Sequence, residues 1–353
     1  MQHEPKPIDV TPSQLEEMAR DAIASDSPLF VWGDGGIGKS RILEKTIKAA
    51  ELEYCDFRAM IRDLPDLLGY GVVTEMREGE PCPMTAPAGL PSPHSEKRWG
   101  IVFEELSASA RMMQGALYGT ILERQGLPKH NRVFATGNTS QSGGILNAMP
   151  KPLASRFTHV RLVCSPPDHL AHAYADGWHP HVIGYHEMTK GEDWFNFDPK
   201  SPEETYACPR TWESVSQRLH VKPVRPDILT QTMAGKLGYG VGQKFSSFVR
   251  LADELAPTTI AMRESPLDCP IPDNAAAKWF LAATTAAAKE ESQKDPAAFA
   301  RWAIPFLCRL GDELAVFSMN VATRHAPQLG RTPEFANHFA RNPRFAALAQ
   351  FCK

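Results

Sequence analysis

The residues with the clearest chemistry are Gly33–Ser40, whose sequence GDGGIGKS fits the pattern G-x-x-x-x-G-K-[ST]. Glycines in such a loop let consecutive backbone N–H groups turn toward one anion without obstruction by side chains. Lys39 is then placed to reach the β- and γ-phosphates of a nucleotide, and the Ser40 hydroxyl to bind Mg²⁺. The pattern predicts an ATP- or GTP-binding loop that uses Gly33, Asp34, Gly35, Gly36, Ile37, Gly38, Lys39, Ser40 and Arg41.

A glycine-rich hairpin or turn is the alternative interpretation of this loop. Its neighbours argue against the alternative, because the apolar run Pro28–Trp32 predicts a buried strand before it and a helix-compatible segment, about Lys39 to Ala50, follows. A helix that begins at this point directs the positive end of its dipole at the bound phosphates.

Two adjacent carboxylates end a second apolar segment, Trp99–Leu106, with the sequence WGIVFEEL. In phosphate-loop enzymes an acid at a strand end holds the Mg²⁺ shell, and another orients the attacking water. This pattern assigns Glu104 to the metal and Glu105 to the water. The alternative is that both glutamates are only first-turn acids of a solvated helix. The phosphate loop upstream favours the catalytic interpretation.

Two further polar residues are candidates for the same site. Asn138 follows the predicted strand Arg132–Thr136, from which its amide can meet the γ-phosphate or the attacking water; the alternative is an Asx-turn residue. Arg156 lies in Leu153–Val160, where a helix end runs into a strand. It is either a cation at a helix C-terminus or an arginine finger inserted into the site of a neighbouring subunit.

The chain as a whole is consistent with a protein of two or three domains that bury a sizeable core. It has 353 residues, 42% hydrophobic content and a formal net charge of −3, which does not favour a nucleic-acid binder. Its seven cysteines are widely spaced and include no C-x-x-C, so reduced thiols are expected. No apolar run reaches the length of a membrane span and no export signal is visible, so we predict a cytoplasmic protein.

Several elements must position these residues. Thr11 and Pro12 predict the start of a helix beside the nucleotide, and residues 74–97, which contain five prolines, predict an exposed loop. A helix is expected over Ala108–Gln125. After the break at Pro166-Pro167-Asp168, helix-compatible segments dominate.

The second half of the chain offers weaker signals. Its cluster of histidines, His169, His172, His179, His181 and His186, lacks the cysteines or acids of a metal site, so packing and surface roles are favoured. The glycines in residues 232–250 predict a glycine-broken pair of helices, because no strand precedes them. Apolar periodicity predicts three more helices, over Ala275–Lys289, Phe299–Val321 and Phe335–Phe351, with a core of Trp279, Phe280, Trp302, Phe306 and Phe317.

In order and spacing, these segments resemble the AAA+ ATPases, and specifically their MoxR-like branch. The shared core is GDGGIGKS, WGIVFEEL, VFATGN and LASRF. Three further segments are similar to the branch: DLLGY at Asp66–Tyr70, the helix at Ala108–Arg124, and PRTWE at Pro209–Glu213. The resemblance covers residues from about 10 to 250.

This resemblance implies a fold and a set of roles. The fold is a three-layer α/β P-loop NTPase core with a parallel sheet (1–165), then a helical lid (166–255) and a C-terminal helical extension (256–353). Asn138 is the first sensor, Arg156 the finger acting in trans, and Arg210 the second sensor from the lid. Glu104 departs from the family pattern, in which Asp is usual at this position.

The resemblance further implies the activity: hydrolysis of ATP, with Mg²⁺, by a homo-oligomeric and usually hexameric ring that remodels a client protein. A partner protein with a von Willebrand factor A (VWA) domain is common in this branch. The preference for adenine rests on the resemblance alone. Two alternatives stay open, namely a nucleic-acid motor or loader with the same core, which the acidic charge disfavours, and a nucleotide-dependent switch with little hydrolysis.

Overall fold

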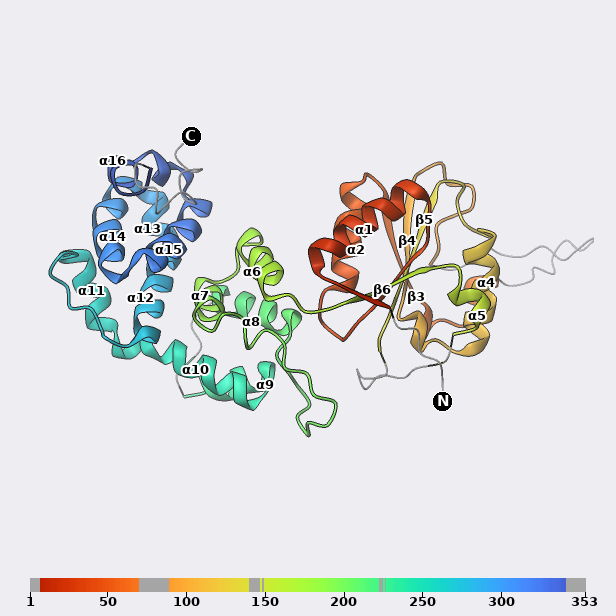
Figure 1. Ribbon diagram of the computed structural model, residues 1–353, viewed down its shortest axis with the longest axis horizontal. Coiled ribbons are helices and arrows are strands. Elements are labelled where there is room, and N and C mark those ends of the chain that lie inside the picture. Colours follow the sequence, from red (N-terminus) through yellow and green to blue (C-terminus); the bar gives the residue numbers. More distant parts are fainter. Residues whose placement is uncertain are drawn as a thin grey trace, which may run out of the picture. The chain divides into compact units, whose positions relative to one another are not determined.

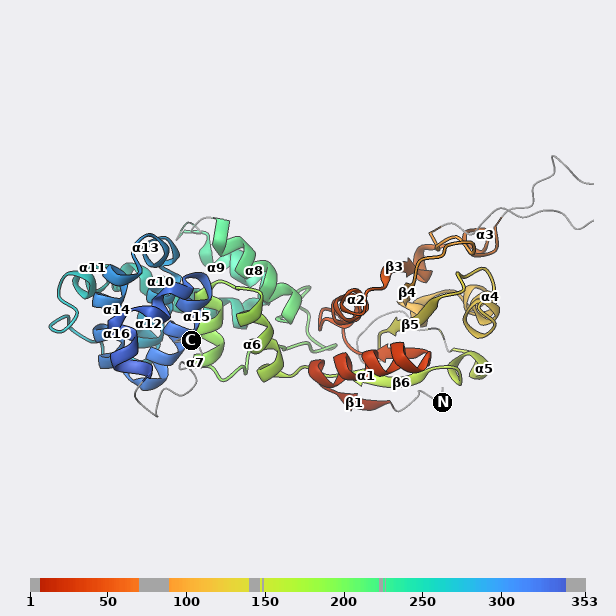
Figure 2. The same cartoon turned by 90° about the horizontal axis from the view of Figure 1, so that it is seen from above.

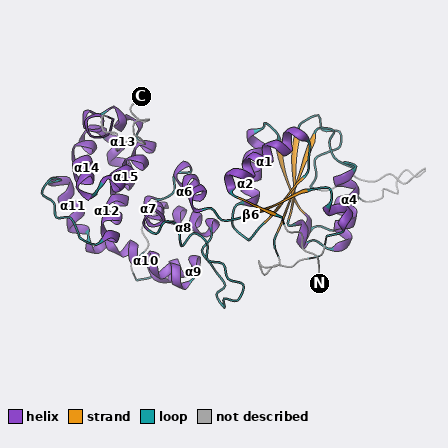
Figure 3. Cartoon of the chain, viewed as in Figure 1, coloured by secondary structure: helices purple, strands orange, loops and turns teal. Residues whose placement is uncertain are grey.

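The computed structural model describes residues 7–69, 89–139, 147, 149–221, 225 and 227–340 (Figure 1). Two compact units divide the chain, one up to Ser165 and one from Pro166. The first unit is an α/β structure, whereas the described residues of the second form helices and loops (Figure 3).

One parallel sheet forms the centre of the first unit. Its six described strands follow the order β1-β6-β2-β5-β4-β3, and every neighbouring pair is parallel. The strands are β1 (Ile8–Val10), β2 (Leu29–Trp32), β3 (Glu53–Arg58), β4 (Trp99–Glu104), β5 (Asn131–Gly137) and β6 (Thr158–Leu162). Because all strands run the same way, their carboxyl ends meet at one edge of the sheet, where ligands of such sheets bind.

Helices cover both faces of this sheet, which gives three layers. Helices α1 and α2 lie on one face and α4 and α5 on the other (Figures 1 and 2). The helices of this unit are α1 (Pro12–Ser25), α2 (Lys39–Ala49), α3 (Leu64–Leu68), α4 (Arg111–Leu122) and α5 (Lys151–Ala154). The predicted α/β core with a parallel sheet is confirmed.

Local sequence explains where these elements begin. Thr11 caps α1 through a reciprocal capping box with Gln14, and Pro12 occupies the first turn, where its missing N–H costs nothing. The central strands β2 and β4 are apolar and buried on both faces, as parallel strands between helices must be. Phe30, Phe57 and Phe103 are fully buried in the core between the layers.

The start of one helix differs from the sequence prediction. The helix expected over Ala108–Gln125 begins only at Arg111, because a short 3₁₀ turn, Leu106–Ala108, first carries the chain away from β4. Residues 74–88 of the predicted exposed loop, and Tyr70 of the DLLGY segment, lie outside the described residues. Two further 3₁₀ turns are Ala59–Ile61 and, in the second unit, Pro327–Arg331.

All the regular elements in the described residues of the second unit are helices. They are α6 (Pro166–Ala175), α7 (Pro180–Met188), α8 (Pro209–Val221), α9 (Leu229–Leu237), α10 (Tyr239–Glu254), α11 (Ala256–Glu264), α12 (Ala275–Ala287), α13 (Lys289–Lys294), α14 (Pro296–Leu310), α15 (Asp312–His325) and α16 (Pro333–Phe335), with a π turn at Ala336–Ala340. The predicted glycine-broken pair is confirmed as α9 and α10, which meet at Gly238 with φ +81°. A Cβ at Gly242 would lie 2.4 Å from the Ala234 backbone, so this glycine permits the close crossing of the two helices.

Two expectations for the C-terminal helices need correction, and a third lies partly outside the described residues. The single helix predicted over Phe299–Val321 is two helices, α14 and α15, because Gly311 with φ +129° ends the first. Trp302 is only half-buried, and the guanidinium of Arg263 lies 4.9 Å from its ring centroid. Residues 341–351 of the last predicted helix lie outside the described residues.

No helix in the described ranges has the length and apolar character needed to cross a membrane.

Candidate nucleotide site

The loop between β2 and α2 has the backbone geometry that a phosphate-binding loop requires. Gly33, Gly36 and Gly38 have φ values of +151°, +79° and +99°. A Cβ at Gly33 would lie 2.7 Å from Cδ1 of Ile37 and 2.9 Å from the Leu162 carbonyl oxygen, so only glycine fits there. Gly38 stands directly before Lys39, and the N-terminus of α2 therefore opens onto the loop.

The ammonium of Lys39 joins the loop to the neighbouring strand end. Its Nζ donates hydrogen bonds to the carbonyl oxygens of Gly33 and Asp34, at 2.7 and 2.9 Å, and to Oδ1 of Asn138 at 3.0 Å. Asn138 comes directly after β5, which pairs with β2. Two residues that are 99 positions apart in sequence are thus in contact.

Glu104 is a buried carboxylate at the end of β4, only 8% exposed. The Thr136 hydroxyl donates to its Oε2, whereas its Oε1 has no hydrogen-bond partner among the described residues. Burial raises the pKa of Glu104, and hydrogen bonds to Thr136 and to Ser40 lower it. The carboxylate and the Ser40 hydroxyl of the phosphate loop are therefore neighbours.

Glu105 differs from Glu104 in both its backbone and its exposure. It adopts the left-handed conformation, with φ 52° and ψ 35°, and its side chain is exposed. Its backbone N–H donates to the Thr136 hydroxyl at 3.0 Å. A left-handed backbone at a residue other than glycine is uncommon and often occurs at functional sites.

Sequence reasoning missed the residues that support these groups. Thr136 contacts both glutamates, and the Ser107 hydroxyl accepts a hydrogen bond from the Asn138 backbone N–H at 3.1 Å. Both side chains are buried, with 1% exposure. A polar residue at a buried strand position was the available signal for Thr136, whereas Ser107 had none.

Hard oxygen ligands suit Mg²⁺, and the pair Ser40–Glu104 provides them. A buried carboxylate oxygen without a hydrogen-bond partner, Glu104 Oε1, is a group that a cation would satisfy. The residues at this position therefore fit the metal.

Arg156 does not lie at this edge of the sheet. It precedes the first residue of β6, so it stands at the amino ends of the strands, opposite the phosphate loop. The five residues of β6 span roughly 17 Å at ~3.3 Å per residue. The exposed residue Arg156 is thus separated from its own phosphate loop by the length of a strand.

A hydrogen-bonded chain connects the Arg156 turn to the strand before the loop. Trp32 Nε1 donates to Nδ1 of His159 at 2.9 Å, so the remaining proton of the neutral ring is on Nε2, which donates to the Ala154 carbonyl at 2.8 Å. Burial lowers the pKa of His159, which favours this neutral form.

The other predicted nucleotide contacts are less constrained. Asp34 Oδ1 accepts a hydrogen bond from Thr139 at 3.4 Å, and Arg41 is exposed on α2. Arg210 belongs to the second unit, where it is exposed in the first turn of α8. Its role at the nucleotide stays a prediction.

Comparison with known proteins gives only distant likenesses. No family model and none of the curated proteins matches this chain. A putative ATPase from Cytophaga hutchinsonii is similar at 12% identity and TM-score 0.34, over 88% of this chain and 79% of the other. NtrX from Brucella abortus in complex with ADP is similar at 12% identity and TM-score 0.39, over 96% and 68%. The Thermotoga maritima RuvB Holliday junction branch migration motor is similar at 12% and 0.33, over 73% and 75%.

These identities and TM-scores are low. The interpretation of the site therefore depends on the loop, the strand order and the contacts within this chain.

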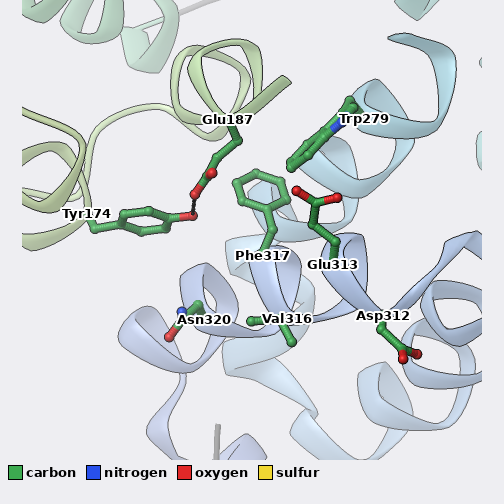
Figure 4. A pocket seen from close by; sticks show the side chains of 8 residues that line it. All are labelled: Tyr174, Glu187, Trp279, Asp312, Glu313, Val316, Phe317 and Asn320. Atoms are coloured by element: carbon green, nitrogen blue, oxygen red, sulfur yellow. Dashed lines mark hydrogen bonds between the residues drawn. The ribbon is translucent and has the colours of Figure 1, made fainter. Parts of the chain in front are cut away.

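The second unit contains a pocket of about 340 Å³, lined by residues of that unit (Figure 4). Tyr174 donates a hydrogen bond to Glu187 at 2.7 Å, while Trp279 and Phe317 line the pocket beside Glu313. Burial raises the pKa of Glu187, the hydrogen bond from Tyr174 lowers it, and the charge of Glu313 raises it. No motif in the sequence pointed to this pocket.

Two of the five clustered histidines are buried in the same unit, whereas His172, His179 and His181 are partly exposed. His186 is 1% exposed and stacks on Trp194 with ring centroids 3.7 Å apart. His169, 5% exposed, lies 5.7 Å from the same indole. The described residues contain no group of three or more metal-ligating side chains that would hold a metal ion.

Proposed function

We propose that this chain is an ATPase of the AAA+ type, whose first unit binds ATP with Mg²⁺ and hydrolyses it. The observation that carries this proposal is the contact of Lys39 with Asn138, next to the Ser40–Glu104 pair and the left-handed Glu105. These groups come from three neighbouring strand ends, where a triphosphate bound on the loop would place its γ-phosphate.

Each group has one task in this reaction. The loop N–H groups and the N-terminus of α2 bind the phosphates, and Lys39 exchanges its carbonyl contacts for phosphate oxygens. Ser40 and Glu104 are the residues that would hold Mg²⁺, which neutralises charge on the β- and γ-phosphates when bound. The exposed Glu105 carboxylate orients the attacking water and accepts its proton, and Asn138 holds the γ-phosphate or that water.

Assembly into a homo-oligomeric ring completes the site in this proposal. The position of Arg156 at the opposite edge of its own sheet supports a role in trans, because a cation there approaches only a neighbouring subunit's nucleotide. Arginine fingers accelerate phosphoryl transfer by about 10³- to 10⁵-fold. Arg210 would reach the nucleotide from the helical unit, and the division of that unit into a lid (166–255) and an extension (256–353) is part of this proposal.

The resemblance to MoxR-like ATPases supports a proposal for the cellular task. We infer that a hexameric ring remodels a client protein together with a VWA-domain partner, and that residues 74–97 face the client.

The test is ATP turnover by wild type, Glu105→Gln and Arg156→Ala, each followed by size measurement with and without ATP. Wild type should hydrolyse ATP, Glu105→Gln should bind ATP without turnover, and Arg156→Ala should assemble yet be inactive. Mixing Arg156→Ala with Glu105→Gln should restore turnover, because a mixed interface pairs an intact Glu105 with an intact Arg156. A wild type that neither binds nor hydrolyses ATP would overturn the proposal.

The nucleotide-dependent switch is the second candidate. It is favoured by Glu104, a buried glutamate where Asp is usual, whose burial raises its pKa. Tight ATP binding with turnover no faster in wild type than in Glu105→Gln would support the switch. A gain of turnover in Glu104→Asp would identify the extra methylene as the cause.

A further inference from the structure

A single buried hydroxyl connects the two glutamates of the candidate site. Thr136 lies on β5, one residue beyond the pair Phe103–Ala135, and therefore beside the end of β4. Its Oγ1 donates a hydrogen bond to Glu104 Oε2 and accepts one from the Glu105 backbone N–H at 3.0 Å. Its side chain is buried, with the residue 1% exposed.

The chemistry of a hydroxyl fits this position. A threonine hydroxyl has one proton to donate and lone pairs to accept, so it bonds to a carboxylate and an N–H at the same time. Valine has the same shape but does neither.

The backbone of Glu105 needs this support. Its φ of 52° and ψ of 35° place it in the left-handed region, which is unfavourable for a residue with a Cβ. It also directly precedes the 3₁₀ turn Leu106–Ala108, so its N–H has no partner within that turn. The Thr136 hydroxyl supplies the partner and holds the backbone in the conformation that leaves the Glu105 side chain exposed.

We propose that Thr136 is a positioning residue that couples the metal-side acid to the water-activating acid. Its hydroxyl fixes the rotation of the Glu104 carboxylate, so that Oε1 faces away from Thr136 and is the oxygen left for a cation. The same oxygen fixes the backbone of Glu105. When a bound cation displaces the Glu104 carboxylate, Thr136 Oγ1 moves with it and shifts the Glu105 backbone, because this one oxygen bonds to both residues. This inference rests on the proposed ATPase function.

The experiment compares Thr136→Val, which removes the hydroxyl at constant shape, with Thr136→Ser, which keeps it. Thr120→Val is the matched control, because Thr120 is also buried in the first unit, 6% exposed, but lies on helix α4. Amide hydrogen exchange at Glu105 is measured without nucleotide, and kcat, KM and ATP affinity are measured with Mg²⁺.

Loss of the hydroxyl should speed exchange at the Glu105 amide and lower kcat by roughly 10- to 100-fold, the effect of removing hydrogen bonds to a charged group. KM and ATP affinity should change by less than about threefold, because Lys39 and the loop N–H groups, which bind the phosphates, are untouched. Thr136→Ser should restore both readouts, and Thr120→Val should alter neither.

Unchanged Glu105 exchange in Thr136→Val, or an equal loss of kcat in Thr120→Val, would overturn the positioning role. If Thr136→Val does not fold, the pair Thr136→Ser and Thr136→Ala makes the same comparison. An inactive wild type that does not bind ATP would instead overturn the ATPase function, so the two failures are distinguishable.

Discussion

The first unit buries Glu104 among polar partners, whereas the second buries His169 and His186 among aromatic rings. Hydroxyls of Ser40 and Thr136 reach the carboxylate of Glu104. In contrast, both ring nitrogens of His186 and Nε2 of His169 have no hydrogen-bond partner among the described residues. Burial raises the pKa of Glu104 and lowers the pKa of His169 and His186, which in each case favours the neutral form.

The surroundings of these buried groups distinguish a candidate functional site in the first unit from a structural core in the second. A buried acid that accepts hydrogen bonds from hydroxyls is held in a defined direction, which a phosphoryl-transfer site requires. A histidine between indoles stays neutral and contributes packing area. Perturbed titration alone therefore does not locate function in this chain, because the surrounding hydrogen bonds decide what the group does.

The largest expected effect concerns the phosphate loop. Lys39→Ala should weaken ATP binding by more than about 100-fold, because the ammonium is the loop's charged donor to the phosphates. Isothermal titration calorimetry measures this loss. Lys45→Ala is the control, since Lys45 lies on the same helix but is exposed and pairs with Glu16. Equal weakening by both substitutions would mean that general charge, and not the loop, attracts the nucleotide.

Acid should act on the second unit through its neutral histidines. Burial lowers the pKa of His169 to about 4, below the unfolded value near 6.5, so the unfolded chain binds more protons between these two pH values. Stability should be intact above pH ~6.5 and fall as the pH decreases toward ~4, by about 3 kcal/mol for this residue.

Thermal melts between pH 7 and 4.5 measure the loss, and His169→Phe should reduce it. His94→Gln is the control, because His94 is exposed in the first unit. If the stability of His169→Phe fell with decreasing pH as much as that of the wild type, His169 would not be the source of the acid sensitivity.

Glycines at positive φ should also distinguish the two units. Gly33→Ala should abolish nucleotide binding and destabilise the fold, because the new Cβ meets the Leu162 carbonyl oxygen at 2.9 Å. Gly177→Ala, with φ +64° and open space around the site, should cost only about 1 kcal/mol of backbone strain. Denaturant unfolding and ATP titration of both variants measure the contrast. A larger loss of stability in Gly177→Ala than in Gly33→Ala would contradict this prediction.

The smallest expected effect is at the surface of the second unit. Arg263 pairs with Glu291 at 2.8 Å and stacks over Trp302. Arg263→Ala should lower the free energy of unfolding by about 0.5–1 kcal/mol, since both contacts are partly solvated. Urea unfolding measures this change, with Arg225→Ala as a control that removes only an exposed ion pair. If both variants lost the same free energy of unfolding, the contact of Arg263 with the Trp302 indole would contribute nothing to stability.

Much of the first unit was predictable because its signals are local. The strand, glycine loop and helix around Gly33–Ser40 follow from apolar runs, glycine and helix propensity within a few residues of each other. The apolar segment that ends in Glu104 and Glu105 is likewise a buried strand. The helix break at Gly311 was missed, because apolar periodicity continues across it while the backbone does not.

Sequence alone determined which residue types are present to bind phosphate and where the strands that carry them begin. The tertiary structure decided which of them meet. It brought Asn138 into contact with Lys39, and Thr136 into contact with both Glu104 and Glu105. These contacts form because β2, β5 and β4 are neighbours in the sheet although they are not consecutive in the chain. The tertiary structure also placed Arg156 at the opposite edge of the sheet from the phosphate loop. Arg156 lies before the first residue of β6, and the length of that strand separates the two edges. Strand order depends on long-range pairing, and residue spacing does not encode it.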